Sequence, residues 1–151
     1  MSGRIKALWS KRAHRGPMDS LREATLIPGQ GLEGSVGRST RRQVTVLASE
    51  AWVSAVAGLA KDPGPASRRA NIMISGVELA NTRGRVLRLG ACRIAVGGEV
   101  RPCERMDEAA PGLRAALSAD WRGGVFGQVL TGGIIRIGDL VEWEPTPDDD
   151  R

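Results

Sequence analysis

The sequence predicts a mainly β protein, folded as a small barrel or sandwich with two or three short helices. Three observations point to this class. Short stretches alternate apolar and polar residues, glycine is abundant at 20 of 151 residues, and helical periodicity is confined to two segments. Many short strands joined by glycine-rich turns are typical of sandwiches and barrels.

The expected strands follow from β-branched residues, alternation and bounding turns. Val44 and Val46 share one face of their strand, and Ile72 and Ile74 do the same further on. Pro28 and Gly29 stop an earlier strand. The expected strands cover residues 4–9, 21–27, 43–47, 71–75, 85–89, 92–96, 125–130, 134–137 and 140–143.

A hairpin is expected near the C-terminus, because residues 131–133 (Thr-Gly-Gly) separate two of these strands. Two segments are expected to be helical. In the first, Ser49 caps a helix that runs through Lys61, with Trp52 in its apolar stripe. The second, residues 104–119, is interrupted by Pro111 and Gly112, which predicts two short helices.

Length and the absence of a long apolar run limit the organisation of the chain. Its 151 residues predict a single domain over residues 1–143. Residues 144–151 carry two prolines and three aspartates, and we expect this acidic tail to be disordered. No apolar run approaches the ~20 residues that a membrane span needs, and no secretory signal is recognisable, which predicts a cytoplasmic protein without a membrane partner.

The chain is basic, with a formal net charge of +5, and almost all of its cations are arginines. Arginine suits bidentate binding of phosphate or carboxylate, although an arginine-rich proteome would leave the same signature. Charge alone also allows a nucleic-acid-binding module. One phenylalanine, four tryptophans and no tyrosine offer few stacking surfaces, and no nucleic-acid motif is present, so this alternative is the weakest.

Residues 29–34 (Gly-Gln-Gly-Leu-Glu-Gly) match the dinucleotide fingerprint literally. That fingerprint requires a helix to begin within the glycines, whereas the residues that follow have no helical apolar stripe. We therefore expect a glycine-rich connection between strands. It could still form an anion-binding nest with Arg38, Arg41 and Arg42.

The two cysteines are predicted to differ. Cys92 shares strand parity with Ile94 and is expected to be buried. Cys103 follows Pro102 at the start of a helical pattern, between Arg101 and Arg105, where the thiolate form is favoured. Their spacing is no zinc or disulfide signature, and the single histidine, His14, nearly excludes a histidine-based metal site or a Ser-His-Asp triad.

An ordered set of segments resembles the MOSC domain family, the module at the C-terminus of molybdenum-cofactor sulfurases and of stand-alone bacterial proteins. The segment around Cys103 resembles the family's P-C-x-x-M stretch, which carries its characteristic cysteine. Ser35, where many relatives have aspartate, and a shortened stretch to Arg41 depart from the pattern. The matching segments are residues 31–34 (GLEG), 42–47 (RQVTVL), 69–72 (RANI) followed by Gly76-Val77, 101–106 (RPCERM), 122–124 (RGG) and 132–139 (GGIIRIGD).

The resemblance implies a small β-barrel of the MOSC, pyruvate-kinase-like type and a link to the molybdenum cofactor (molybdopterin). It implies Cys103 as the molybdenum ligand in the reduction of N-hydroxylated compounds, with electrons from a separate electron-transfer protein. The alternative is a sulfur carrier with a persulfide on Cys103, supplied by a cysteine-desulfurase-type donor. Pyridoxal phosphate would then stay on that partner.

The chemistry of the cofactor suggests which other residues would bind it. Molybdenum held by soft sulfur accepts a thiolate, and the cofactor's phosphate suits arginine. Asn71 could hydrogen-bond the pterin edge from the strand face opposite Ile72. The residues predicted to bind the cofactor are therefore Arg69, Asn71, Arg101, Arg105 and Arg122, with Cys103 as the catalytic residue and metal ligand.

Overall fold

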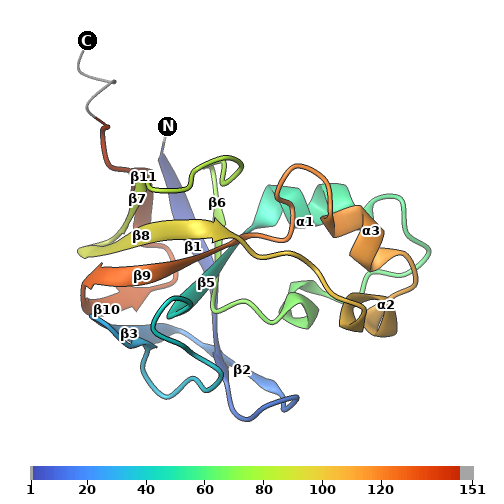
Figure 1. The fold of residues 1–151 in the computed structure, drawn as a ribbon, viewed down its shortest axis with the longest axis horizontal. Helices are drawn as coiled ribbons and strands as arrows, with labels where there is room; N and C mark the ends of the chain where they lie inside the picture. Colours follow the sequence, from blue (N-terminus) through green and yellow to red (C-terminus); the bar gives the residue numbers. More distant parts are fainter. Residues whose placement is uncertain (1, 147–151) are drawn as a thin grey trace.

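The computed structural model describes residues 2–146 and contains a closed barrel of seven strands (Figure 1). The strand order is β11-β7-β8-β9-β5-β6-β1, and β11 also pairs with β1, which closes the barrel. The mainly β prediction is confirmed, and closure decides for the barrel over the sandwich. The barrel strands are β1 (Ser2–Lys11), β5 (Val44–Ala48), β6 (Ile72–Ser75), β7 (Val86–Leu89), β8 (Cys92–Glu99), β9 (Val125–Thr131) and β11 (Leu140–Trp143).

Strand parity fills the barrel interior, as the alternating patterns predict. In β8, Cys92, Ile94 and Val96 are buried and the residues between them are partly exposed. Cys92 is completely inaccessible, and burial followed by the charge of Asp139 raises the pKa of its thiol. The prediction that Cys92 is a core residue is confirmed.

The expected hairpin over residues 125–137 is wrong. β9 pairs with β5 and β8 in the barrel, whereas β10 (Gly133–Arg136) pairs with β3 (Glu23–Ile27) in a separate sheet completed by β4 (Gly31–Leu32). Gly132, the single residue between β9 and β10, allows this crossing instead of a turn. A Cβ at Gly132 would lie 2.5 Å from the Leu26 carbonyl oxygen, so only glycine allows so close an approach.

The strand expected over residues 21–27 is divided at Arg22. Residues before the break form β2 (Met18–Leu21), which pairs with β1, and residues after it form β3. The fingerprint glycines contain no helix: they form turns around β4, as expected for a connection between strands. A Cβ at Gly31 would lie 1.9 Å from the Gln43 carbonyl oxygen, so this glycine permits close backbone contact.

Three short α-helices pack on one end of the barrel, where they form a second apolar cluster (Figure 1). A 3₁₀ turn, η1 (Pro65–Arg68), lies beside α2. They are α1 (Ser49–Val56), α2 (Arg105–Ala109) and α3 (Leu113–Leu117). The break at Pro111 and Gly112 is confirmed. The first helix is shorter than expected and Ser49 is not its cap: Ala48 holds that position, and the Ser49 hydroxyl bonds Glu50 instead.

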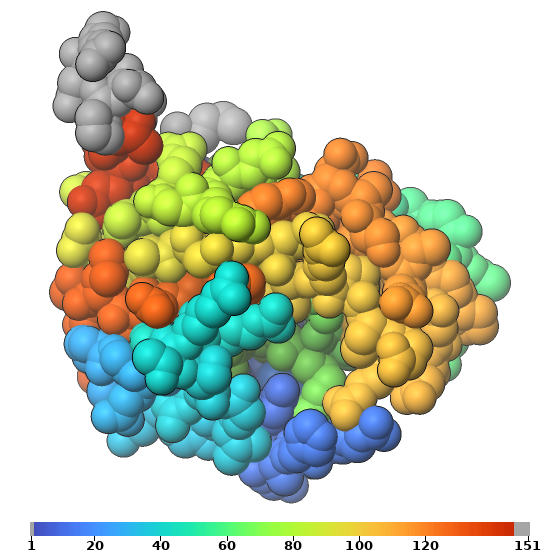
Figure 2. Space-filling view, in the orientation of Figure 1, coloured from blue at the N-terminus to red at the C-terminus, as the bar shows by residue number. Residues whose placement is uncertain are grey.

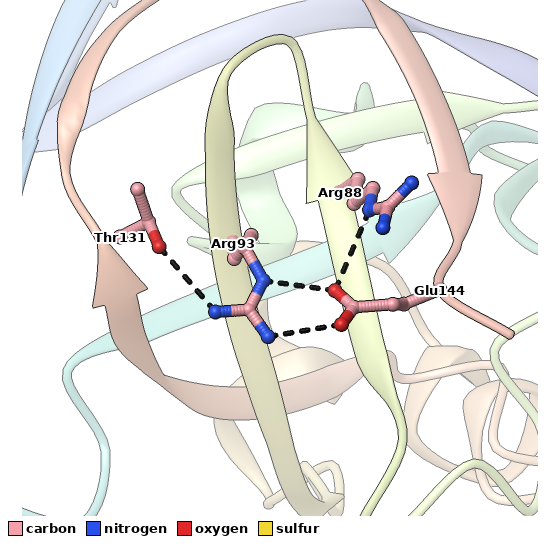
Figure 3. Close-up of polar contacts among 4 residues, drawn as sticks. All are labelled: Arg88, Arg93, Thr131 and Glu144. Atoms are coloured by element: carbon pink, nitrogen blue, oxygen red, sulfur yellow. Dashed lines mark hydrogen bonds and ion pairs between the residues drawn. The ribbon is translucent and has the colours of Figure 1, made fainter. Parts of the chain in front are cut away.

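The last described residues are tied to the barrel surface by Glu144 (Figure 3). Arg93 donates two hydrogen bonds to its carboxylate, at 2.8 and 3.0 Å, and the Nε of Arg88 lies 3.4 Å away. The predicted disordered tail falls mostly on residues 147–151, which lie outside the described part. Within residues 2–146, no helix is long and apolar enough to cross a membrane.

Candidate functional site

Cys103 lies at the junction that the sequence predicts, between the end of β8 and the start of α2. Its carbonyl oxygen accepts the Met106 N–H at 3.0 Å, which begins the helical turn. Its thiol is free and exposed, in contrast to Cys92. The prediction of one buried and one accessible cysteine is confirmed.

A cavity of about 220 Å³ opens beside Cys103. Figure 2 shows the hollow, with the green chain near residue 70 at its floor and the blue, cyan and gold segments around it. Among residues 2–146, six cationic residues line the cavity, and no aspartate, glutamate or histidine does. The cations are Lys11, Arg38, Arg42, Arg68, Arg69 and Arg105. We call this cavity the Cys103 pocket.

Arg68 carries a buried positive charge in this pocket and is only 9% exposed. Its guanidinium donates to the carbonyl oxygens of Gly123 and Val100, both at 2.9 Å, and lies 3.9 Å from the Met106 sulfur. Within residues 2–146, no carboxylate pairs with it. Burial lowers the pKa of Arg68, and the nearby Cys103 acts in the opposite direction. Buried charges are normally paired, so this arrangement favours an anion in the pocket.

Arg69 and Lys11 add to the uncompensated positive charge of the pocket. Arg69 has a left-handed backbone, with φ of +66°, and donates one hydrogen bond to the Gly16 carbonyl oxygen. Its Nη2 is buried without a partner among the described residues. Burial, then the charge of Arg105, lowers the pKa of Arg69, and burial, then Arg69 and Arg105, lowers that of Lys11. A bound anion would relieve this repulsion.

Asn71 lies in the pocket wall, but its amide is fully occupied by the protein. Its Oδ1 accepts from the N–H of Thr45 at 3.1 Å and contacts the Thr45 hydroxyl at 3.3 Å. Its Nδ2 donates to the Trp9 carbonyl oxygen at 3.3 Å and to the Ser35 hydroxyl at 3.2 Å. The amide therefore joins β1, β5 and the loop after β4, and it has no hydrogen-bonding capacity left for the pterin edge.

Ser35, which departs from the family pattern, is 2% exposed, and its hydroxyl oxygen is used within the protein. Its oxygen accepts the Lys11 N–H at 2.9 Å as well as the Asn71 amide. Both lone pairs are thus used, and the hydroxyl proton has no acceptor among the described residues. Because Ser35 lines the pocket, this proton is a potential donor to a ligand.

The structure brings four of the six predicted site residues together and leaves two apart. Cys103, Arg69, Asn71 and Arg105 line the pocket, but Arg101 and Arg122 do not. The Arg101 side chain is 88% exposed and lies 3.9 Å from Glu99. Arg122 lines a different cavity beside α1 and donates to the Ala116 carbonyl oxygen. Arg101 is two residues from Cys103 and Arg122 is next to Gly123, which also lines the pocket, yet both arginine side chains lie on other surfaces.

The sequence argument missed Lys11 and Arg68. Arg38 and Arg42, which it assigned to a possible anion nest, do line the pocket. Lys11 ends β1, and its position could have been anticipated only by knowing that β1 runs beside β6. Arg68 directly precedes Arg69 in the matching segment, but only the 3₁₀ turn shows that its side chain is buried.

A second hollow of about 500 Å³ adjoins the Cys103 pocket and shares Arg69, Arg105 and Met106 with it. Because the two hollows share three lining residues, together they offer room for a larger ligand than the Cys103 pocket alone. Within residues 2–146, no group of three or more histidine, cysteine, aspartate or glutamate side chains could hold a metal ion by itself. Any metal at Cys103 would therefore bring further ligands of its own.

Comparisons with known proteins agree with this fold. Among solved structures, the chain is similar to the YuaD protein from Bacillus subtilis, with 17% identity and a TM-score of 0.78 over 93% of this chain and 94% of that one. It is also similar to YiiM from Geobacillus stearothermophilus (15% identity, TM-score 0.75, 95% and 75% covered) and to YiiM from Escherichia coli (16%, 0.70, 95% and 70%). No curated protein matches the chain.

The family is shown by a different comparison. A family model described as the MOSC domain matches residues 12–142, which extend from the residue after β1 into β11. This range includes the Cys103 pocket apart from Lys11. The chain belongs to the MOSC domain family.

Proposed function

We propose that this protein binds the molybdenum cofactor in the Cys103 pocket and reduces N-hydroxylated compounds, with electrons from a separate electron-transfer protein. The observation that carries the proposal is an accessible thiol in a pocket that, within residues 2–146, is lined by six cations and no carboxylate. A soft metal and a phosphate on one ligand need this combination of donors.

The residues present fit the cofactor. Cys103 would supply a thiolate to molybdenum, and Arg69 and Arg105 would bind the phosphate. Within the described residues, Arg68 is a buried charge without a counter-ion, and the Arg69 Nη2 is a donor without a partner, so both could bind an anionic oxygen. Asn71 would act as a positioning residue, because its amide holds the pocket wall together.

When bound, the cofactor would supply the two-electron redox chemistry. Reduction of an N–O bond also consumes protons, and these must come from the protein or from water. Lys11 is the lining group suited to holding such a proton, at its Nζ, because burial and the charges of two arginines lower its pKa and so ease release of the proton. Within residues 2–146, no carboxylate or imidazole lines the Cys103 pocket itself, and Glu108 lines only the adjoining hollow.

A sulfur-carrying role for Cys103 is the second candidate, and the exposure of the thiol favours it. A protein donor of the cysteine-desulfurase type could reach this sulfur directly. Its persulfide would pass the terminal sulfur to the Cys103 thiolate and regain a thiol, with no net oxidation. The pyridoxal phosphate of such a reaction belongs to the donor.

Molybdenum analysis of protein made in a cofactor-competent host tests the first role. We expect molybdenum in the parent, none in Cys103→Ser, and a severalfold loss in Arg105→Ala. Arg101→Ala is the matched control, since it removes a flanking arginine outside the pocket and should retain metal. Molybdenum retained by Cys103→Ser at the parent's level would overturn the proposal, and persulfide sulfur on metal-free parent would favour the second role.

A further inference from the structure

We propose that Cys103 also accepts sulfur directly from small anionic sulfane donors of the thiosulfate class, without a protein donor. The inference rests on the sulfur-carrying role proposed above and names its substrate class. It is carried by the hydrogen-bonding capacity and charge of the Cys103 pocket.

The free polar groups of the pocket are donors. The acceptor oxygens of Asn71 and Gln43 are used within the protein, the latter by the Val129 N–H at 2.9 Å. The donors that remain within residues 2–146 include the Ser35 hydroxyl proton and the Arg69 Nη2. They also include the side chains of Lys11, Arg42 and Arg105, which make no hydrogen bond or ion pair there, although Arg42 lies over the Phe126 ring. Such a set binds the oxygens of a sulfonate or phosphate and offers little to a ligand's N–H groups.

The same cations remove the main obstacle to thiosulfate chemistry. A thiolate and a dianion repel each other, and the repulsion is strong where water is partly excluded. Arg68 is buried and has no carboxylate partner within residues 2–146, so Arg68 and Arg69 compensate that charge before the donor arrives. The cavity of about 220 Å³ is large enough for a ligand of five heavy atoms.

The transfer itself balances without an added oxidant or acid. The Cys103 thiolate attacks the outer sulfur of thiosulfate and forms a new S–S bond. The bond between the two sulfurs of thiosulfate breaks, and its electron pair leaves with sulfite. The products are a Cys103 persulfide anion and a sulfite dianion, so the total charge is unchanged.

Within residues 2–146 the lining has no carboxyl or imidazole general acid, and this step does not need the Lys11 proton. Sulfite leaves as a stable dianion and needs no protonation, whereas ester or amide substrates need a general acid for their leaving group. The pocket supplies what this leaving group does need, which is compensating positive charge at its oxygens.

The test uses the full chain made in a host that lacks the molybdenum cofactor. The protein is incubated with thiosulfate, and sulfite release and the intact mass are measured. We expect one sulfite per chain, one added sulfur on Cys103 and no reaction in Cys103→Ser. Arg69→Ala and Arg105→Ala should slow the transfer at least tenfold, while Arg101→Ala should react at the parent's rate.

A neutral probe separates charge from misfolding. Alkylation of Cys103 by iodoacetamide should change less than threefold in the two arginine variants. No sulfite from the parent, or equal slowing by Arg101→Ala, would overturn the inference. Because molybdenum retention is measured on separately prepared, cofactor-loaded protein, a negative thiosulfate result leaves the molybdenum proposal standing, and the reverse also holds.

Discussion

Replacing Asn71 by alanine distinguishes a residue that holds the pocket together from one that binds a ligand. The side chain is 8% exposed and makes four hydrogen-bonding contacts, two to Thr45 and one each to Trp9 and Ser35. Each such bond contributes about 1 kcal/mol net, and some freed partners will regain water at the pocket, so the expected loss is roughly 2–4 kcal/mol. For a chain of this size, a loss of 3 kcal/mol lowers Tm by roughly 6–12 °C.

Urea unfolding of the parent and of Asn71→Ala measures this loss, with Gln30→Ala as the control because Gln30 is an exposed amide. The control should stay within about 0.5 kcal/mol of the parent. If Asn71→Ala is as stable as the parent but loses molybdenum, the amide binds the ligand and the structural interpretation is refuted. If stability falls as predicted, any loss of metal follows from distortion of the pocket wall.

Three further outcomes follow from the charges and burial described above. Native protein should be alkylated at Cys103 and not at Cys92, and faster labelling of Cys92 would contradict the assignment of one exposed and one buried sulfur. The ratio of the alkylation rate with anionic iodoacetate to that with neutral iodoacetamide should be higher at Cys103 than for a free thiol in solution. Hydrogen bonds from Arg93 lower the pKa of Glu144, so the stability this group adds is present above about pH 4–5 and is lost as the pH falls through its folded value. The difference in stability between the parent and Glu144→Gln, measured from pH 7 to pH 3, should therefore shrink on acidification, and a constant difference would contradict the linkage. Lys11→Met should raise the stability of the ligand-free protein by up to about 1 kcal/mol, because it removes a cation that Arg69 and Arg105 repel. The same variant should bind phosphate more weakly, because the pocket loses a positive charge. An unchanged phosphate affinity in calorimetry would place the anion elsewhere.

Sequence patterns located most strands and both short helices around Pro111, because those patterns record local requirements. Alternation in β8 separates Cys92 from the surface, and Pro102 followed by a helical pattern exposes Cys103. The same local argument placed a hairpin at Thr131, where glycines instead carry the chain between two sheets. A glycine pair permits a turn or a close crossing, and local chemistry does not distinguish them.

The identity of the pocket residues depended on pairing between distant strands. The family motifs led to Cys103, Arg69 and Arg105, and they led equally to Arg101 and Arg122, which face other surfaces. Lys11 reaches the pocket because β1 pairs with β6, and Asn71 is bound to Trp9 and Ser35 across the same junction.

The sequence by itself determined where most of the strands lie, which cysteine is accessible and which family motif contains it. These properties follow from side-chain parity, turn residues and order along the chain, all of which act over a few positions. Only the tertiary structure decided that the barrel closes, that Arg68 is a buried cation with no carboxylate partner among residues 2–146, and that the Asn71 amide is used entirely by the protein. Burial and hydrogen-bond saturation are set by which distant segments meet, and no local pattern records that meeting.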